Sequence, residues 1–223
     1  MALLEIKDLR KQFHTPDGEP HTVVNIKAFA LGHAQQMALE GGSGSGKTTF
    51  LNLIAGILSA DAGSILIDRQ DICAGNESKR DKLRAQNIGY IFQTFNLLQG
   101  FTAIENVALG MAFGGGVDLA YARQLLSQVG LSDRADYLPR QMSVGQQQRV
   151  AVARALANKP KLVLADEPTG NLDRRNASEA LDLIRNICET NGASLLLVSH
   201  DRDVLSKFDH LKKFEEVNDQ LSA

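Results

Sequence analysis

The chain has 223 residues, of which 43% are hydrophobic and 22% charged, and 24 Lys and Arg stand against 26 Asp and Glu. This composition is typical of a globular protein of one domain, or of one domain with an added lobe. The formal net charge of −2 disfavours a nucleic-acid grip over the whole chain. No apolar run approaches the ~20 residues of a membrane span, and two cysteines build neither a disulfide framework nor a zinc site.

Strands and helices alternate through the first part of the chain. Apolar residues that alternate with polar ones, or that run between turn residues, predict strands. These strands are expected at residues 4–9, 23–31, 36–40, 64–68 and 88–93. Helical spacing is found at 48–58, and a charged helix is expected at 79–86. The first strand is expected to be an edge or antiparallel strand, because charged residues alternate along it.

Helical patterns dominate from Thr94 to Asn158, and strands return after that segment. Helices are expected at 104–111, 119–129 and 145–157, with a loop at Gly114–Gly116. A continuous apolar run at 162–165 is typical of a parallel strand that is covered on both faces. A helix at 177–190, a strand at 193–199 and a helix at 201–207 follow. The order predicts one α/β domain, 1–223, with a core of about 1–93 and 159–223 and a helical lobe of about 94–158.

Residues 41–48, GGSGSGKT, place two glycines five positions apart before Lys and Thr, between a strand and a helix. Glycines let successive backbone N–H groups point at phosphate oxygens, and the start of the helix adds its positive end. Lys47 is expected to bridge the β- and γ-phosphates, and the Thr48 hydroxyl to hold Mg²⁺. The nucleotide-binding residues expected here are Gly41, Gly42, Ser43, Gly44, Ser45, Gly46, Lys47, Thr48 and Thr49.

Two carboxylates follow the apolar run 162–165 directly, and the carboxyl ends of parallel strands face the ligand crevice. Asp166 is placed to hold Mg²⁺, and Glu167 to accept a proton from the water that attacks the γ-phosphorus. Gln93 ends another strand and could reach the metal or the water, while His200 could donate to the γ-phosphate. The catalytic set is therefore Glu167, His200, Gln93 and Lys47, and the expected Mg²⁺ ligands are Thr48, Gln93 and Asp166. The alternative is an acidic turn exposed after a core strand.

The segment Met142–Arg149, MSVGQQQR, resembles the signature sequence of the ABC ATPases, which are the nucleotide-binding subunits of ABC transporters. Further matches follow in the family's order, and the resemblance covers essentially the whole chain. They are Phe13 for the aromatic that stacks on adenine, Gln93 for the Q-loop, Asn171–Asp173 for the D-loop and His200 for the switch histidine. The resemblance implies a RecA-like P-loop NTPase core of mainly parallel strands, an antiparallel β subdomain at the N-terminus and an inserted α-helical lobe.

The resemblance also implies that two subunits meet head to tail and enclose two ATP molecules. Ser143, Gly145 and Gln146 would then act in trans, on the ATP that is held by the opposite subunit. An oxyanion is stabilised at a helix N-terminus, so this contact is physically reasonable. Asp173 would contact the facing phosphate loop. One chain has one phosphate loop and one signature, which predicts a homodimer.

One position departs from the family pattern, which usually has Gly-Gly where this chain has Val144-Gly145. Val is β-branched, and a positive φ at that position would be costly. Ser143 and Gly145 keep the expected phosphate contact. We therefore expect Val144→Gly to raise the ATPase rate.

The segments 89–98, 101–107 and 167–173 resemble those of the lipoprotein-releasing, macrolide-efflux and cell-division ABC ATPases. Members of this subfamily pair with an integral membrane permease and commonly transmit force, so export or mechanotransmission is expected. The segment Gln93–Glu105 is expected to dock the permease. The implied location is cytoplasmic, peripheral on the inner face of the cell membrane through the permease, and no nucleic-acid partner is expected.

Two other functions are weighed against an ATPase that drives a transporter. A soluble ABC ATPase that acts on nucleic acid or the ribosome would usually carry two cassettes or a long coiled-coil insert, and neither is present in the sequence. A P-loop kinase would need an acceptor site and a lid, and it would leave residues 142–149 unexplained.

Overall fold

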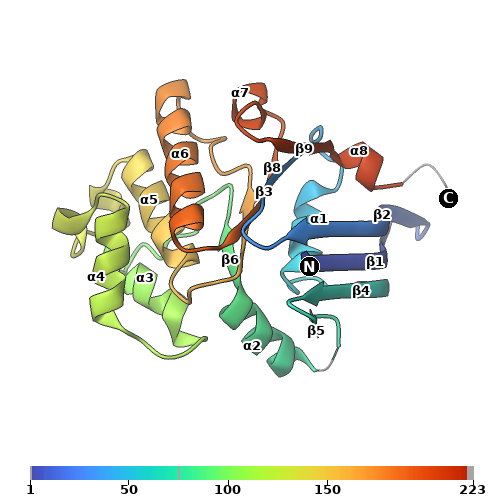
Figure 1. Ribbon diagram of the computed structural model, residues 1–223, viewed down its shortest axis with the longest axis horizontal. Coiled ribbons are helices and arrows are strands. Elements are labelled where there is room, and N and C mark those ends of the chain that lie inside the picture. Colours follow the sequence, from blue (N-terminus) through green and yellow to red (C-terminus); the bar gives the residue numbers. More distant parts are fainter. Residues whose placement is uncertain (1, 75, 220–223) are drawn as a thin grey trace.

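The computed structural model describes residues 2–74 and 76–219, in which helices surround two sheets (Figure 1). The first sheet is antiparallel and has the strand order β2-β1-β4-β5. Its strands are β1 (Ala2–His14), β2 (Pro20–Gly32), β4 (Ala62–Ile67) and β5 (Gln70–Asp71). Strand β1 pairs antiparallel with both β2 and β4, so it lies inside the sheet and not at its edge.

The second sheet is parallel and has the strand order β6-β7-β8-β3-β9. Its strands are β6 (Ile88–Ile91), β7 (Leu162–Asp166), β8 (Ser194–Ser199), β3 (Gln36–Glu40) and β9 (His210–Lys213). Every residue of β7 and β8 is buried, which agrees with their continuous apolar sequences.

Eight α-helices are formed by the described residues. They are α1 (Lys47–Ile54), α2 (Glu77–Asn87), α3 (Ala103–Ala112), α4 (Leu119–Gln128), α5 (Val144–Ala155), α6 (Arg174–Thr190), α7 (Arg202–Leu205) and α8 (Phe214–Val217). The short 3₁₀ helices η1 (Ser132–Arg134) and η2 (Pro139–Gln141) precede α5. Helices α3, α4 and α5 gather on the side of the molecule opposite the antiparallel sheet (Figure 1).

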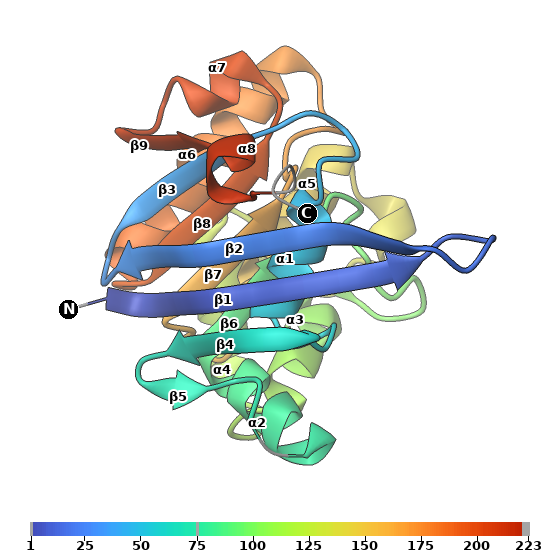
Figure 2. The same ribbon diagram turned by 90° about the vertical axis from the view of Figure 1, so that its right-hand side faces the viewer.

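Alternating residues of the central strands divide the interior into two apolar cores. Leu162 and Leu164 of β7 pack into the core that contains α1 and the antiparallel sheet. Val163 and Ala165 point the other way, into the core built with α3 to α6. This division follows from the two-residue period of a strand. Figure 2 shows the antiparallel sheet in front of α1, which is therefore enclosed between the two sheets.

Across residues 2–74 and 76–219, no helix has the length and apolar character that a membrane crossing requires.

Candidate active site

The glycine-rich loop joins the end of β3 to the start of α1 at the centre of the molecule. Gly44 and Gly46 have φ angles of 78° and 97°, in the left-handed region that favours glycine. A Cβ on Gly46 would also lie 2.9 Å from the Val23 carbonyl oxygen, so this position has no room for a side chain. The fully buried Phe214 supports the loop from below, because its Cβ lies 3.3 Å from the position that a Cβ on Gly41 would take.

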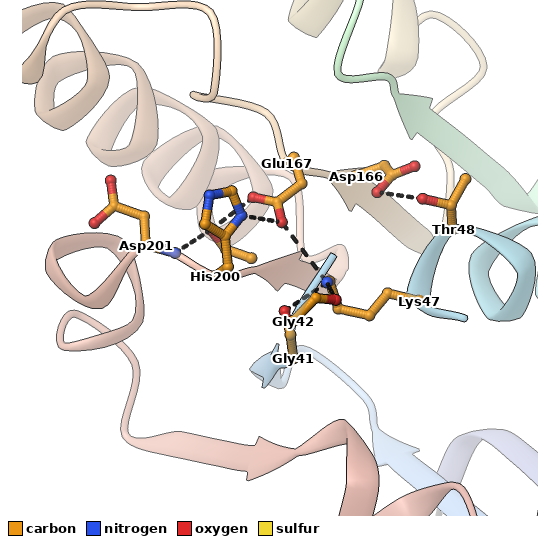
Figure 3. Close-up of polar contacts among 9 residues, drawn as sticks. Gly41, Gly42, Lys47, Thr48, Asp166, Glu167, His200 and Asp201 are labelled. Carbon is orange, nitrogen blue, oxygen red and sulfur yellow. Dashed lines mark hydrogen bonds and ion pairs between the residues drawn. The ribbon is translucent and has the colours of Figure 1, made fainter. Parts of the chain in front are cut away.

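Lys47 and Ser45 supply polar groups that match a bound phosphate. The Lys47 ammonium donates to the carbonyl oxygens of Gly41 and Gly42, at 2.5 and 2.7 Å, and so lies within the curl of the loop (Figure 3). The buried Ser45 hydroxyl has no hydrogen-bond partner within the described residues. A phosphate oxygen would satisfy both groups, since an oxyanion accepts strong hydrogen bonds from such donors.

A cavity of about 270 Å³ opens above the loop. Its lining unites the phosphate loop with residues that follow β6, β7 and β8 and with one residue of β2. The lining residues are Val23, Ser43, Gly44, Ser45, Gly46, Lys47, Thr48, Thr49, Gln93, Glu167 and His200. Most of the residues that the sequence placed at a nucleotide therefore face one another in one hollow.

Thr48 and Asp166 form the part of the site that fits a divalent cation. The Thr48 hydroxyl donates to Asp166 Oδ1 over 3.2 Å (Figure 3). Burial raises the pKa of Asp166, the hydrogen bond from Thr48 opposes this rise, and the charge of Glu167 adds to it. A cation beside Asp166 would favour its ionised form. Within the described residues there is no group of three or more His, Cys, Asp or Glu that could hold a metal alone. The donor set therefore fits Mg²⁺ that arrives with phosphate oxygens.

Glu167 is held in a fixed position by contacts on both carboxylate oxygens. Its Oε2 accepts a hydrogen bond of 2.9 Å from the Ser199 hydroxyl. Its Oε1 lies 2.7 Å from His200 Nδ1 and 3.9 Å from the Lys47 ammonium (Figure 3). The Glu167 backbone has a φ of 43°, which is strained for a residue with a side chain. Its N–H donates to the Val198 carbonyl over 3.0 Å, and its own carbonyl accepts from the Gly170 N–H over 3.1 Å.

The D-loop segment is tied to Gln93 and to the start of α6. The Asn171 side-chain amide donates to the Gln93 carbonyl over 2.7 Å. Asp173 caps α6, where its carboxylate accepts from the N–H groups of Arg175 and Asn176, each at 3.1 Å. The hydrogen bonds from the Asn176 amide and side chain hold the pKa of Asp173 below its ordinary value.

The signature residues form a helix N-terminus away from the phosphate loop. Ser143 is the N-cap of α5 and forms a reciprocal capping box with Gln146. Among residues 2–74 and 76–219, a Cβ added to Gly145 would meet only the Asn176 side chain within 4 Å, at 3.9 Å, so this side of the helix is open. Neither Ser143, Gly145 nor Gln146 lines the cavity above the phosphate loop.

The sequence suggested a strained backbone at Val144, and this expectation is wrong. Val144 is the first residue of α5, and it is not among the described residues with positive φ. Its side chain is 50% exposed. The backbone therefore accommodates Val144 without strain, and the reason for expecting faster turnover in Val144→Gly disappears.

Phe13 lies on β1, paired with His21 of β2. Its ring is 40% exposed, and the Lys11 ammonium lies 5.5 Å from the ring centroid. Phe13 does not line the cavity above the phosphate loop, although Val23, two positions after His21, does. Its stacking on adenine remains a prediction.

Three residues that hold the site together went unrecognised in the sequence. Ser199 ends β8 and donates to Glu167. Gln148 donates to the Pro168 carbonyl. Arg154 of α5 donates to the carbonyls of Phe95 and Asn96, and burial lowers the pKa of its guanidinium. Only the place of Ser199 at a strand end, directly before His200, could have indicated its contact.

A glycine-rich phosphate loop between a parallel strand and a helix, with carboxylates at the end of a neighbouring strand, defines the class of P-loop nucleoside triphosphatases. Residues 24–170 match the family model of the ABC transporter. The lipoprotein-releasing system ATP-binding protein LolD 1 of Caulobacter vibrioides is 43% identical over 209 residues, covering 92% of this chain and 89% of that protein. LolD of Shewanella frigidimarina is 41% identical over 213 residues, covering 93% and 88%. The chain belongs to the ABC transporter family and is an ATP-binding subunit that hydrolyses ATP.

Solved structures of dimeric cassettes share this fold. The ATP-binding cassette MJ0796, dimeric and bound to ADP and Pi after hydrolysis, has a TM-score of 0.85 and 31% identity, and the match covers 97% of this chain and 95% of that one. A second dimeric structure of MJ0796, a bacterial ABC transporter cassette, has a TM-score of 0.84 and 32% identity, with 94% and 93% covered.

Proposed function

We propose that two copies of this chain close head to tail on two Mg·ATP and drive a permease of the lipoprotein-releasing type. The observation that carries this proposal is the separation of the two halves of a site on one chain. The phosphate-loop cavity contains Lys47 and Glu167, whereas Ser143 and Gly145 lie at the open N-terminus of α5 and do not line it. A two-fold dimer would supply the missing half twice.

Within each site, the phosphate loop would bind and orient the nucleotide. The backbone of residues 43–46, the Ser45 hydroxyl and the Lys47 ammonium would hold the β- and γ-phosphates. Thr48, Asp166 and Gln93 would hold Mg²⁺, which when bound supplies charge neutralisation between the phosphates. The start of the partner's α5 would complete the phosphate contacts from the opposite side.

Glu167 would be the base for the attacking water. It lines the phosphate-loop cavity, and both carboxylate oxygens are held by Ser199 and His200. A base that is fixed in position can accept a proton from water without reorganising. His200 would steady Glu167 and donate to the γ-phosphate, and Gln93 would orient the water.

The segment Gln93–Glu105 would dock the permease. Leu98 and Phe101 expose 42% and 43% of their surface there. The loop is rigid because the fully buried Asn106 bonds to the Leu98 N–H and to the carbonyls of Leu98, Phe101 and Thr102. An exposed apolar pair on a rigid loop suits a membrane protein's cytoplasmic helix. The chain would then be peripheral on the inner face of the cell membrane.

A pull-down from gently solubilised native membranes tests this function. The Glu167→Gln chain is used with ATP, and the bound proteins are identified. We expect a permease with few membrane helices, which the additional change Phe101→Asp removes. Leu211→Asp is the matched control, because Leu211 is equally exposed, at 44%, on β9. If only soluble proteins or nucleic acid are recovered, and no membrane protein, the proposed function is contradicted. The segment Gln93–Glu105 would then have no permease to dock.

A further inference from the structure

Gln148 is a buried polar residue in the signature helix. Only 1% of its surface is exposed, and it lies on α5 five positions after Ser143. Its side-chain Nε2 donates a hydrogen bond of 2.5 Å to the Pro168 carbonyl, while its Oε1 is buried and has no partner within the described residues. An unsatisfied buried acceptor costs about 1–3 kcal/mol. An apolar residue of similar volume would remove the unpaired Oε1 but leave the Pro168 carbonyl unpaired, so the two costs roughly cancel and stability alone gives no reason for Gln148.

The acceptor of this hydrogen bond is next to the proposed base. Pro168 follows Glu167, whose φ of 43° is strained and persists only where its surroundings hold it. The backbone of Glu167 itself is held at both groups: its N–H donates to the Val198 carbonyl, and its carbonyl accepts from the Gly170 N–H. Pro168 has no N–H, so its carbonyl is its only backbone hydrogen-bonding group. The Gln148 amide fixes that carbonyl and with it the turn that presents Glu167.

Helix α5 therefore has two contacts that matter for ATP. Its N-terminus, Ser143 and Gly145, would touch the ATP held by the partner. Gln148 lies about 7–8 Å beyond Ser143 along the same helix and holds the turn of Glu167, which would act on this chain's own ATP.

We infer that Gln148 is a positioning residue that couples the signature helix to Glu167. When the N-terminus of α5 binds the partner's ATP, the position of the helix becomes fixed. The hydrogen bond from the Gln148 amide then fixes the Pro168 carbonyl, and the Glu167 carboxylate is oriented toward the attacking water. This inference rests on the proposed head-to-tail arrangement. Gln148 does not line the cavity above the phosphate loop, so its effect on the reaction would pass through Glu167.

The test compares Gln148→Met with Gln147→Met in the full chain. Gln147 is the matched control, because it is adjacent on α5 but donates to Pro139 and Met142, away from the base. We expect Gln148→Met to lower kcat at least about tenfold with KM for ATP within about twofold, since misplacing a base slows chemistry more than binding. Gln147→Met should keep kcat within about twofold.

A merely structural role would give a different pattern. It would lower the folded fraction of Gln148→Met, measured by circular dichroism, while kcat per folded molecule stayed at the parent value, and that result would overturn the inference. If Gln148→Met does not fold, Gln148→Glu is measured from pH 6 to pH 9. Burial at this position, which is 1% exposed, would raise the pKa of the introduced carboxyl well above its ordinary value. The protonated carboxyl can donate to Pro168 and the ionised one cannot, so we expect its kcat relative to the parent to rise as the pH falls. A constant ratio would overturn the inference.

The single variant Glu167→Gln, with Gln148 unchanged, distinguishes a failure of the proposed function from a failure of the Gln148 inference. If it hydrolyses ATP normally, the proposed base is wrong, whatever Gln148→Met does. If it is inactive while Gln148→Met keeps the parent kcat, the proposed function stands and the coupling by Gln148 is wrong.

Discussion

Gly89 lies where β6 passes beneath the signature helix α5, and replacing it by alanine should destabilise the protein. A Cβ built at Gly89 lies 2.2 Å from the Ala155 carbonyl oxygen and 3.1 Å from Pro160 Cγ. Real Cβ atoms essentially never come closer than 3.0 Å to a heavy atom outside their own residue and its chain neighbours. The strand or the helix must therefore move by almost an ångström, in a region where the interior is close-packed.

The magnitude follows from overpacking. Adding a methyl group to a packed interior costs about 1–3 kcal/mol. At roughly 2 kcal/mol, a protein of this size should lose about 4–8 °C in Tm. The ATPase rate should fall as well, because a shift of α5 displaces the Gln148 contact to Pro168.

Thermal unfolding followed by circular dichroism measures the change. Gly100→Ala is the matched control, since a Cβ at Gly100 meets no described residue within 4 Å and Gly100 is not among the glycines with positive φ. Its Tm should stay within about 2 °C of the parent value. A Gly89→Ala protein with the same Tm as Gly100→Ala would refute the reasoning about this contact.

Three further predictions concern the site. Glu167→Gln should keep ATP binding but nearly abolish turnover; normal phosphate release in a malachite-green assay would show that Glu167 is not the base. Lys47→Ala should lose ATP binding in isothermal titration calorimetry, because the ammonium that lies in the loop is removed, and tight binding would contradict its assignment. The lowered pKa of Asp173 predicts stability that is present above about pH 4 and is lost as the pH falls through its native pKa. In urea unfolding, the free energy of unfolding of the parent should therefore exceed that of Asp173→Asn by less at pH 3 than at pH 6. A difference that does not change with pH would contradict this role of Asp173.

The sequence could predict which strand-end residues lie together because they follow strongly patterned elements. The apolar run of β7 locates Asp166 and Glu167 at a strand end, and the same reasoning locates Gln93 and His200. Carboxyl ends of parallel strands meet at one edge, and the structure brings Gln93, Glu167 and His200 to one cavity.

Other parts depend on contacts between distant segments and could not be predicted. All four residues of strand β9, HLKK, are exposed, and they show no alternation of apolar and polar residues that would predict a strand. This segment is a strand because it pairs with the edge of β3. Phe214 supports the phosphate loop from far along the chain. A charged residue such as Arg154 usually faces water, but the carbonyls of Phe95 and Asn96 accept its hydrogen bonds.

Mixing two inactive variants tests the head-to-tail dimer most directly. Glu167→Gln removes the base from a chain's own site, and Gly145→Arg blocks the partner's ATP from the open side of α5, where a side chain has room in the single chain. Each homodimer should be inactive. A mixed dimer combines both defects in one site and leaves the other intact, so an equal mixture should recover about a quarter of the parent ATPase rate. A mixture that is no more active than its two components would contradict the composite site.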